Sequence, residues 1–247
     1  MSTLPEYFGA AYLINLPERV DRLASAKIEL GRLKWPIGTD GINLFPARRF
    51  AERGGFPNAG VRGAFYSHWE CLQQAHTKGD FGALILEDDI SFSSHIPKLT
   101  PLIISKLEAN NWDIVFFGHY NTGEIPNANS KAEPKEFEFI ECFGEIHGLH
   151  FYGVNSRILG RLNEHLERVA SGREGDQVTG PMPVDGALNT FRRLNPDVRT
   201  FIANPKLGWQ KPSRSDITPA KLDRLPAIRP LMSAFHRIKQ IVDPWRS

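Results

Sequence analysis

The chain has 247 residues, of which 41% are hydrophobic and 23% charged, a composition typical of folded globular proteins and not of disordered ones. Its formal net charge of +2 is too small to indicate nucleic acid as the main partner. No apolar run is long enough to span a membrane, and the N-terminus lacks the basic and apolar regions of a signal peptide. Cys71 and Cys142 form no Cys-x-x-Cys pair, so structural zinc and a disulfide framework are not expected, and we expect a cytoplasmic protein.

Strand and helix patterns alternate from the start of the chain. Residues 8–16 form an apolar run that predicts a buried strand, and residues 18–33 carry apolar side chains at helical spacing. A short strand is expected over residues 35–37. Residues 45–60 are rich in Gly, Pro and Arg and predict a loop, and residues 62–78 predict a helix.

The alternation continues after the helix. Residues 82–90 predict a strand, residues 96–109 a helix and residues 112–117 another buried strand. Residues 121–136 are polar, contain two prolines and predict a loop.

The last third of the predicted domain is less regular. One or two strands are expected over residues 137–154, a helix over residues 156–169, and a loop long enough to cover a site over residues 170–183. Together these elements predict the α/β class: a Rossmann-type three-layer sandwich with a mostly parallel central sheet.

The strand at residues 82–90 ends in three adjacent acids, Glu87, Asp88 and Asp89. Open α/β sheets bind their ligands at the carboxyl ends of the strands, so these carboxylates are expected at a binding site. They repel one another unless a positive charge lies nearby, and Mg²⁺ and Mn²⁺ prefer oxygen ligands. The alternative interpretation is an acidic strand end that is simply solvated.

Several short motifs occur in an order that resembles glycosyltransferase family 25. They are Tyr12-Leu-Ile-Asn-Leu-Pro-Glu-Arg-Val-Asp-Arg22, Thr39-Asp-Gly41, Gly63-Ala-Phe-Tyr-Ser-His68, Leu84-Ile-Leu-Glu-Asp-Asp-Ile90, Trp112-Asp-Ile-Val115, Tyr152-Gly-Val-Asn-Ser-Arg157, Pro183-Val-Asp185, and Gln210 with Ser215-Asp-Ile217. The resemblance implies a GT-A fold, a nucleotide-sugar donor and inversion at the anomeric carbon. It divides the chain into a catalytic domain, residues 1–217, and a C-terminal tail, residues 218–247.

The first motif supplies candidate donor-binding side chains. Asn15 follows the first strand, and Arg19 and Arg22 lie three residues apart on the predicted helix, where guanidinium groups can bind phosphate. A solvated basic face is the alternative. Asp40, beside Gly41, is a candidate partner for ribose or uracil, although Asp-Gly is also a common turn.

The resemblance adds further donor-site residues. Ser67 and His68 are assigned to that site, whereas a lone helical histidine is by chemistry alone more often a packed residue. Gln210 and Asp216, with the neighbouring Ser215, follow a predicted strand and are expected to close the site. Turn and capping roles are the alternative for these three residues.

The same resemblance gives Glu87, Asp88 and Asp89 the role of the DxD motif of GT-A enzymes. They would hold Mn²⁺ or Mg²⁺ against the donor diphosphate, with Asp89 as the expected direct ligand. Inversion needs a base that takes the acceptor proton, and Asp185 is the candidate. A second metal ligand, or an N-cap aspartate of a short helix, are the other interpretations of Asp185.

The tail ends in a basic amphipathic stretch, residues 231–245. It could pack on the domain, which we favour, or rest on an anionic membrane surface where lipid-linked acceptors reside.

The sequence thus predicts an enzyme that moves galactose or glucose from a UDP-sugar to a glycan acceptor such as lipopolysaccharide. Two other function classes remain open: a metal-dependent phosphoesterase, and a non-catalytic sugar-nucleotide-binding protein that retains the fold.

Overall fold

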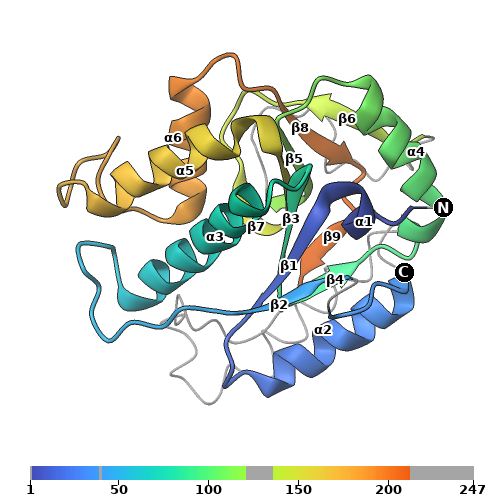
Figure 1. Cartoon of the computed structure of the whole chain (residues 1–247), viewed down its shortest axis with the longest axis horizontal. Coiled ribbons are helices and arrows are strands. Elements are labelled where there is room, and N and C mark those ends of the chain that lie inside the picture. Colours follow the sequence, from blue (N-terminus) through green and yellow to red (C-terminus); the bar gives the residue numbers. More distant parts are fainter. Residues whose placement is uncertain (1, 39–40, 121–135, 212–247) are drawn as a thin grey trace, which may run out of the picture.

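A computed structural model of the chain describes residues 2–38, 41–120 and 136–211 (Figure 1). Its described part is built on a seven-stranded sheet in the order β2-β1-β3-β7-β5-β8-β6. The strands are β1 (Gly9–Asn15), β2 (Asn43–Pro46), β3 (Gly82–Glu87), β5 (Ile114–Tyr120), β6 (Glu138–Glu141), β7 (His147–Asn155) and β8 (Thr200–Asn204). A second, two-stranded sheet pairs β4 (Ile90–Phe92) with β9 (Gly208–Gln210).

Most of the large sheet is parallel. Strands β2, β1, β3, β5 and β8 run in one direction, whereas β7 and β6 run in the other. Strand β7 lies between β3 and β5 and is antiparallel to both. The amino end of β7 therefore lies beside the carboxyl ends of its two neighbours.

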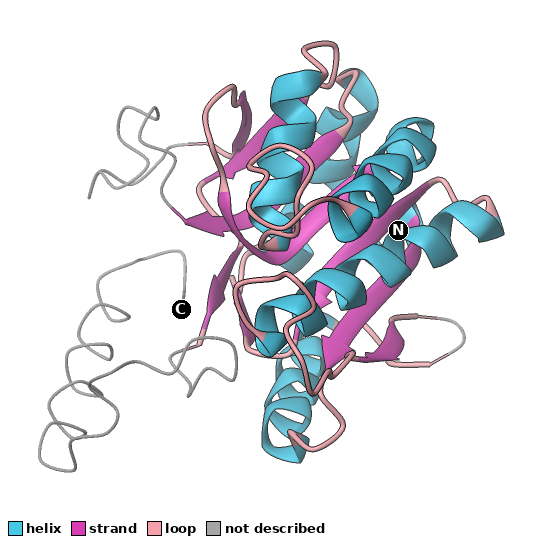
Figure 2. Cartoon of the chain, turned by 90° about the vertical axis from the view of Figure 1, so that its left-hand side faces the viewer, coloured by secondary structure: helices cyan, strands magenta, loops and turns pink. Residues whose placement is uncertain are grey.

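Helices cover both faces of the sheet (Figure 2). One face carries α3 (Ala59–Lys78), α5 (Ser156–Ser171) and α6 (Val184–Leu194), and the other carries α1 (Leu4–Phe8), α2 (Val20–Leu33) and α4 (Ile96–Ala109). The prediction of an α/β sandwich with a mostly parallel central sheet is confirmed.

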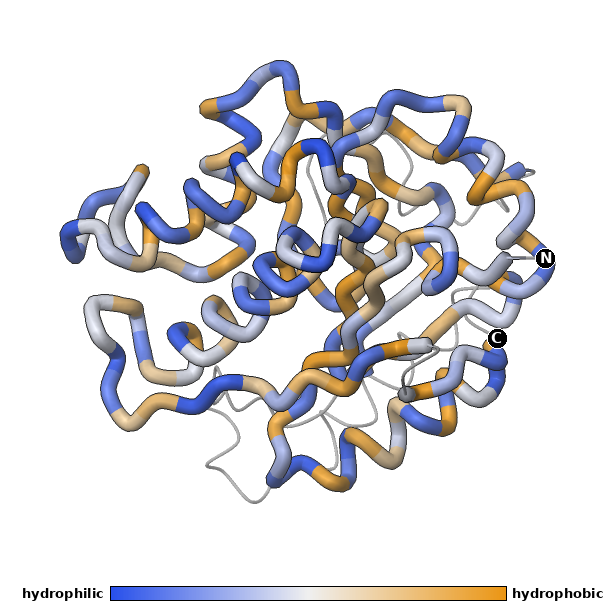
Figure 3. Tube along the Cα trace, in the orientation of Figure 1, coloured by the Kyte–Doolittle hydropathy of each residue, from blue (hydrophilic) through white to orange (hydrophobic). Residues whose placement is uncertain are grey.

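Alternation along the strands separates two hydrophobic cores. In β1, Tyr12 and Ile14 point into the core under α3, α5 and α6, whereas Leu13 points into the core under α1, α2 and α4. Strand β3 repeats the pattern with Ile85 and Leu86. Figure 3 shows the hydrophobic residues gathered in the central strands. Because both faces are covered, the parallel strands are apolar along nearly their whole length.

The first helix is absent from the sequence prediction. Thr3 caps it: its side chain accepts a hydrogen bond from the Glu6 backbone N–H, and the Glu6 carboxylate accepts one from the Thr3 backbone N–H. This reciprocal arrangement is the capping box, whose sequence signature is Thr followed three residues later by Glu.

The expected strand over residues 35–37 is wrong. Only an isolated bridge joins Ile37 to Ile42 there, because the left-handed Lys34 turns the chain and Pro36 has no N–H to donate to a ladder. Helix α2 begins at Val20, two residues after the predicted start at residue 18.

Other boundaries move by a few residues. Helix α3 begins at Ala59, before the predicted start, because Asn58 caps it through a hydrogen bond from the Val61 N–H. Strand β5 begins at Ile114 and extends to Tyr120. Helix α4 has the predicted bounds, and α6 begins just before Asp185 as expected.

Several predictions fall outside the described residues. They concern Asp40, the loop at residues 121–135, Ser215 with Asp216, and the tail. Among the helices that the structure describes, none is long and apolar enough to cross a membrane.

Candidate functional site

The three acids lie at the carboxyl edge of the central sheet. Glu87 is the last residue of β3, and Asp88 and Asp89 form the turn that leads to β4. Because β1 and β3 are parallel neighbours with Ile14 opposite Glu87, Asn15 is brought to the same place. This is the edge at which α/β sheets bind ligands.

Asp88 is fixed by side chains of the first motif. Its Oδ2 accepts a 2.7 Å hydrogen bond from Asn15 Nδ2, and its Oδ1 lies 3.1 Å from Arg22 Nη1. Burial raises the pKa of Asp88, and the contacts with Asn15 and Arg22 only partly offset this effect. Asp88 therefore links β1 and α2 to the end of β3.

Asp89 has the least compensated charge of the three acids. Its Oδ2 lies 3.4 Å from Arg22 Nη1, but its buried Oδ1 has no hydrogen-bond partner within the described part of the chain. Burial raises the pKa of Asp89 to about 7, with further contributions from the nearby Glu87 and Asp88. A bare carboxylate oxygen in such a place is suited to a cation.

Glu87 is held by residues from two other motifs. Its Oε1 lies 3.3 Å from His68 Nε2, and its Oε2 accepts a 2.8 Å hydrogen bond from Gln210 Nε2. Burial alone raises the pKa of Glu87, but the hydrogen bond and charge of His68, with His150 and Gln210, bring it below its ordinary value. The surroundings of Glu87 thus favour its ionised form.

Two tyrosines that the sequence analysis did not assign extend this network. Tyr152 Oη lies 3.1 Å from His68 Nδ1, and the Tyr120 hydroxyl donates a 2.5 Å hydrogen bond to Gln210 Oε1. When the His68 imidazole is neutral and Nε2 carries the proton that faces Glu87, Nδ1 accepts a hydrogen bond from the Tyr152 hydroxyl. The sequence feature that could have pointed to Tyr120 is its position at the carboxyl end of a strand, which is also the position of Glu87.

Two predicted donor-site residues make their contacts elsewhere. The guanidinium of Arg19 pairs with Asp21, so of the two arginines only Arg22 contacts the acids. Ser67 is fully buried, donates to the Gly63 carbonyl and accepts from the Arg48 N–H. These bonds join α3 to the segment after β2.

Asp185 lies in the first turn of α6, next to an imidazole. Its Oδ2 is 3.3 Å from His147 Nδ1, and its Oδ1 accepts a hydrogen bond from the Gly186 N–H. Pro183 occupies the N-cap position of α6, so the N-cap interpretation of Asp185 is wrong. His147 begins β7 and is paired with Tyr120 of β5.

The donor atoms can be tested against the expected metal. Within residues 2–38, 41–120 and 136–211, no three His, Cys, Asp or Glu side chains are grouped to hold an ion by themselves. Mg²⁺-type ions at phosphate sites are, however, commonly held by one or two carboxylates together with substrate phosphates. Asp89, with its bare Oδ1, and the ionised Glu87 fit that pattern.

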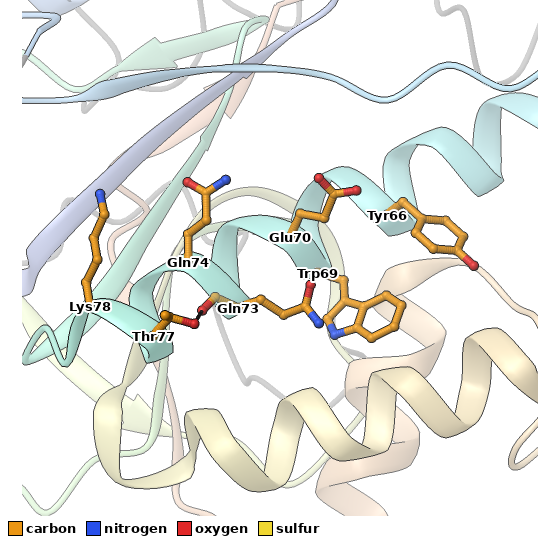
Figure 4. Close-up of a pocket in the computed structure, with 7 residues that line it drawn as sticks. All are labelled: Tyr66, Trp69, Glu70, Gln73, Gln74, Thr77 and Lys78. Carbon is orange, nitrogen blue, oxygen red and sulfur yellow. Dashed lines mark hydrogen bonds between the residues drawn. The ribbon is translucent and has the colours of Figure 1, made fainter.

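A separate groove lies on the outer face of α3 (Figure 4). It is lined by Tyr66, Trp69, Glu70, Gln73, Gln74, Thr77 and Lys78. These residues recur at helical spacing on one face, whereas His68 points from the opposite face toward Glu87. The groove is therefore distinct from the carboxyl-edge site.

Comparison with known protein families and with curated proteins gives no match. Among solved structures the chain is similar to one titled "Crystal Structure of A197 from STIV", with 12% sequence identity and a TM-score of 0.45. The alignment covers 83% of this chain and 85% of that one. At this level of similarity no function follows from the match.

Proposed function

We propose that this protein is an inverting glycosyltransferase of the GT-A type that moves galactose or glucose from a UDP-sugar to a glycan acceptor such as lipopolysaccharide. The observation that carries the proposal is the convergence of separate motifs on one sheet edge. Asn15 and Arg22 from the first motif, His68 from the third and Gln210 from the last all contact the acids of β3. Solvated strand ends do not require such partners.

The donor side of the reaction rests on charge. Arg22 contacts both Asp88 and Asp89 and is placed to neutralise a diphosphate bound beside them. A Mn²⁺ or Mg²⁺ ion, when bound at Asp89 and Glu87, supplies positive charge that stabilises the departing nucleoside diphosphate. His68 and Gln210 hold Glu87 ionised and oriented for that purpose.

The acceptor side belongs to Asp185. Single displacement with inversion requires a group that takes the proton from the attacking hydroxyl, on the side opposite the leaving group. Asp185 contacts His147, which is the cross-strand partner of Tyr120. The Tyr120 hydroxyl in turn bonds Gln210, which donates to Glu87. This arrangement separates an acceptor side from a donor side along one edge.

The proposal is tested by product analysis with UDP-galactose and UDP-glucose, Mn²⁺ and a set of 4-nitrophenyl hexosides. Wild type is expected to release UDP and extend one hexoside. Asp89→Ala is expected to lower the rate at least about 100-fold, because charge stabilisation of the leaving group is lost. Asp197→Ala serves as the matched control, since Asp197 is an exposed aspartate paired with Arg161.

The products separate the function classes. Release of UMP and a hexose phosphate would show cleavage within the diphosphate, as in a phosphoesterase. Nucleotide binding without any turnover would identify a non-catalytic binding protein. Either result would contradict the transferase.

A further inference from the structure

The carboxyl edge of β5 and the amino edge of β7 present an aromatic ring beside an imidazole. Tyr120 and His147 are cross-strand partners, and about half of each side chain is exposed, 48% for Tyr120 and 51% for His147. Gly148, with φ of +82°, lets the Tyr120 ring pack directly against the backbone of β7, because a Cβ atom there would lie 2.6 Å from the ring. The ring therefore lies over a position without a side chain.

The imidazole of His147 has a defined orientation. Asp185 Oδ2 lies 3.3 Å from Nδ1, and a carboxylate only accepts hydrogen bonds, so Nδ1 carries the proton in this contact. The other nitrogen, Nε2, is then the basic atom of the neutral ring. Glu145 Oε2 lies 3.6 Å from Nε2, which is too far for a hydrogen bond, and both side chains are more than half exposed.

This pair is connected to the acidic cluster through Tyr120. The Tyr120 hydroxyl donates to Gln210 Oε1, and Gln210 Nε2 donates to Glu87 Oε2. One face of the site thus runs from Asp185 and His147, across the Tyr120 ring, to the proposed donor carboxylates. An exposed aromatic ring flanked by carboxylates and an imidazole is suited to binding a sugar. The apolar C–H face of the sugar can stack on the ring, and its hydroxyls can donate hydrogen bonds to the carboxylates.

We infer that Tyr120, His147 and Asp185 form the acceptor subsite, in which a hexose lies on the Tyr120 ring and His147 Nε2 takes the proton of the attacking hydroxyl. This inference rests on the proposed function. It makes His147 the base and Asp185 the residue that fixes the tautomer of His147, as a carboxylate does for an imidazole in catalytic triads.

The step balances as follows. The acceptor O–H bond breaks and its proton moves to His147 Nε2, while the acceptor oxygen forms a bond to the anomeric carbon of the donor. The bond from that carbon to the diphosphate oxygen breaks, and its electron pair leaves with UDP. The positive charge that develops on the ring lies between the Asp185 and Glu145 carboxylates.

The experiment uses the full chain with Mn²⁺ and UDP-galactose or UDP-glucose, with water or 4-nitrophenyl β-galactoside as acceptor. Affinity for UDP is measured in parallel by calorimetry. His147→Ala and His147→Gln are expected to lower kcat for UDP release by about 10²- to 10⁴-fold with UDP affinity unchanged. Added imidazole is expected to restore part of the rate in His147→Ala but not in the bulkier His147→Gln. His76→Ala, at an exposed histidine of α3, is the control.

Tyr120 is tested by a split between KM and kcat. Tyr120→Leu is expected to raise KM for the hexoside by a larger factor than it lowers kcat for sugar transfer. Tyr120→Phe, which keeps the ring, is expected to restore KM. Asp185→Asn is expected to lose about 10⁴-fold in kcat, since the amide can hold the wrong tautomer.

Two outcomes would overturn the inference. Full activity of His147→Ala together with an inactive Asp185→Asn would make Asp185 the base itself, and an unchanged KM in Tyr120→Leu would remove the ring from the acceptor site. In both cases metal-dependent UDP binding and sugar transfer by wild type would persist, so the proposed function would stand. Wild type that neither binds UDP nor releases it from a UDP-sugar would contradict both.

Discussion

Buried carboxylates occur at both ends of the central sheet, and they differ in how fully their oxygens are paired with donors and positive charges. At the amino end of β5, Asp113 Oδ1 contacts Arg157 Nε at 2.5 Å, and its Oδ2 accepts a hydrogen bond from the Arg199 N–H at 2.8 Å. At the carboxyl end of β3, Asp88 and Asp89 both contact Arg22 and Glu87 faces His68, but Asp89 Oδ1 has no hydrogen-bond partner among the residues that the structure describes.

The difference separates a structural carboxylate from one that is suited to a ligand. Asp113 has a partner for each oxygen, and its neighbours Arg157 and Arg199 join α5 and β8 to the strand. Among the described residues, the two aspartates after β3 instead share one guanidinium, and burial raises the pKa of both, a cost that natural proteins tolerate mainly at functional sites. Four predictions test this comparison.

The largest effect is expected from Asp113→Ala. Removing Asp113 leaves the Arg199 backbone N–H without its acceptor, whereas the side chain of Arg157 is 39% exposed and can be solvated, so the free energy of unfolding should fall by about 2–4 kcal/mol. Urea denaturation measures the change. Asp197→Ala, which breaks the exposed pair with Arg161, should leave the free energy of unfolding nearly unchanged. Equal losses in the two variants would contradict a special role for Asp113.

The pH dependence of stability tests whether His119, near the carboxyl end of β5, is another buried titratable group whose charged form the fold disfavours. Burial lowers the pKa of His119 from 6.5 to about 4, with a further contribution from Lys206, and Nε2 has no hydrogen-bond partner. The unfolded chain therefore binds this proton first as the pH falls. The stability that His119 contributes is present above pH 6.5 and is lost as the pH falls toward 4.

The expected size of this loss is roughly 3 kcal/mol. His119→Asn removes the titrating group, so its free energy of unfolding should vary less than that of wild type over the same pH range. Denaturation of both proteins at several pH values measures the difference. Parallel curves would show that His119 does not titrate with unfolding.

Asp89→Asn is expected to stabilise the protein in metal-free buffer. It removes a buried charge that lies close to Glu87 and Asp88, so the free energy of unfolding should rise by roughly 0.5–2 kcal/mol while nucleotide binding is lost. Stability and UDP affinity are measured on the same sample. A destabilised variant would mean that Asp89 serves the fold, as Asp113 does.

The smallest effect is expected in the groove of α3. Gln74→Ala changes an exposed side chain on the face opposite His68, so both the free energy of unfolding and UDP affinity should stay within about 0.5 kcal/mol of wild type. A clear loss of UDP affinity would place part of the donor site in the groove.

The sequence was a good guide wherever contacts depend on parallel neighbours. The apolar run of β3 and the acids after it predicted a site at the carboxyl edge, and Asn15 and Arg22 contact Asp88 in the structure. The choice between Arg19 and Arg22 could not be predicted from spacing, because both lie near the start of α2. In the structure Arg19 turns to Asp21.

The acceptor side could not be predicted because it depends on long-range topology. Strand β7 enters between β3 and β5 in the antiparallel direction, which brings His147 beside Tyr120. Periodicity along β7 does not encode its direction or its neighbours. The contact between His147 and Asp185 depends on that insertion and on where α6 begins. A histidine and an aspartate 38 residues apart do not by themselves indicate such a contact in the sequence.

We propose that Asp89 and Glu87, at the carboxyl end of β3, form a metal-dependent nucleotide site. Calorimetric titration of UDP into wild type and Asp89→Asn, each with and without Mn²⁺, tests it most directly. We predict binding to wild type that requires Mn²⁺ and is at least about 100-fold weaker in Asp89→Asn, since the metal loses its buried carboxylate. Equal UDP affinity in the two proteins, or no binding to wild type with Mn²⁺ present, would contradict the account.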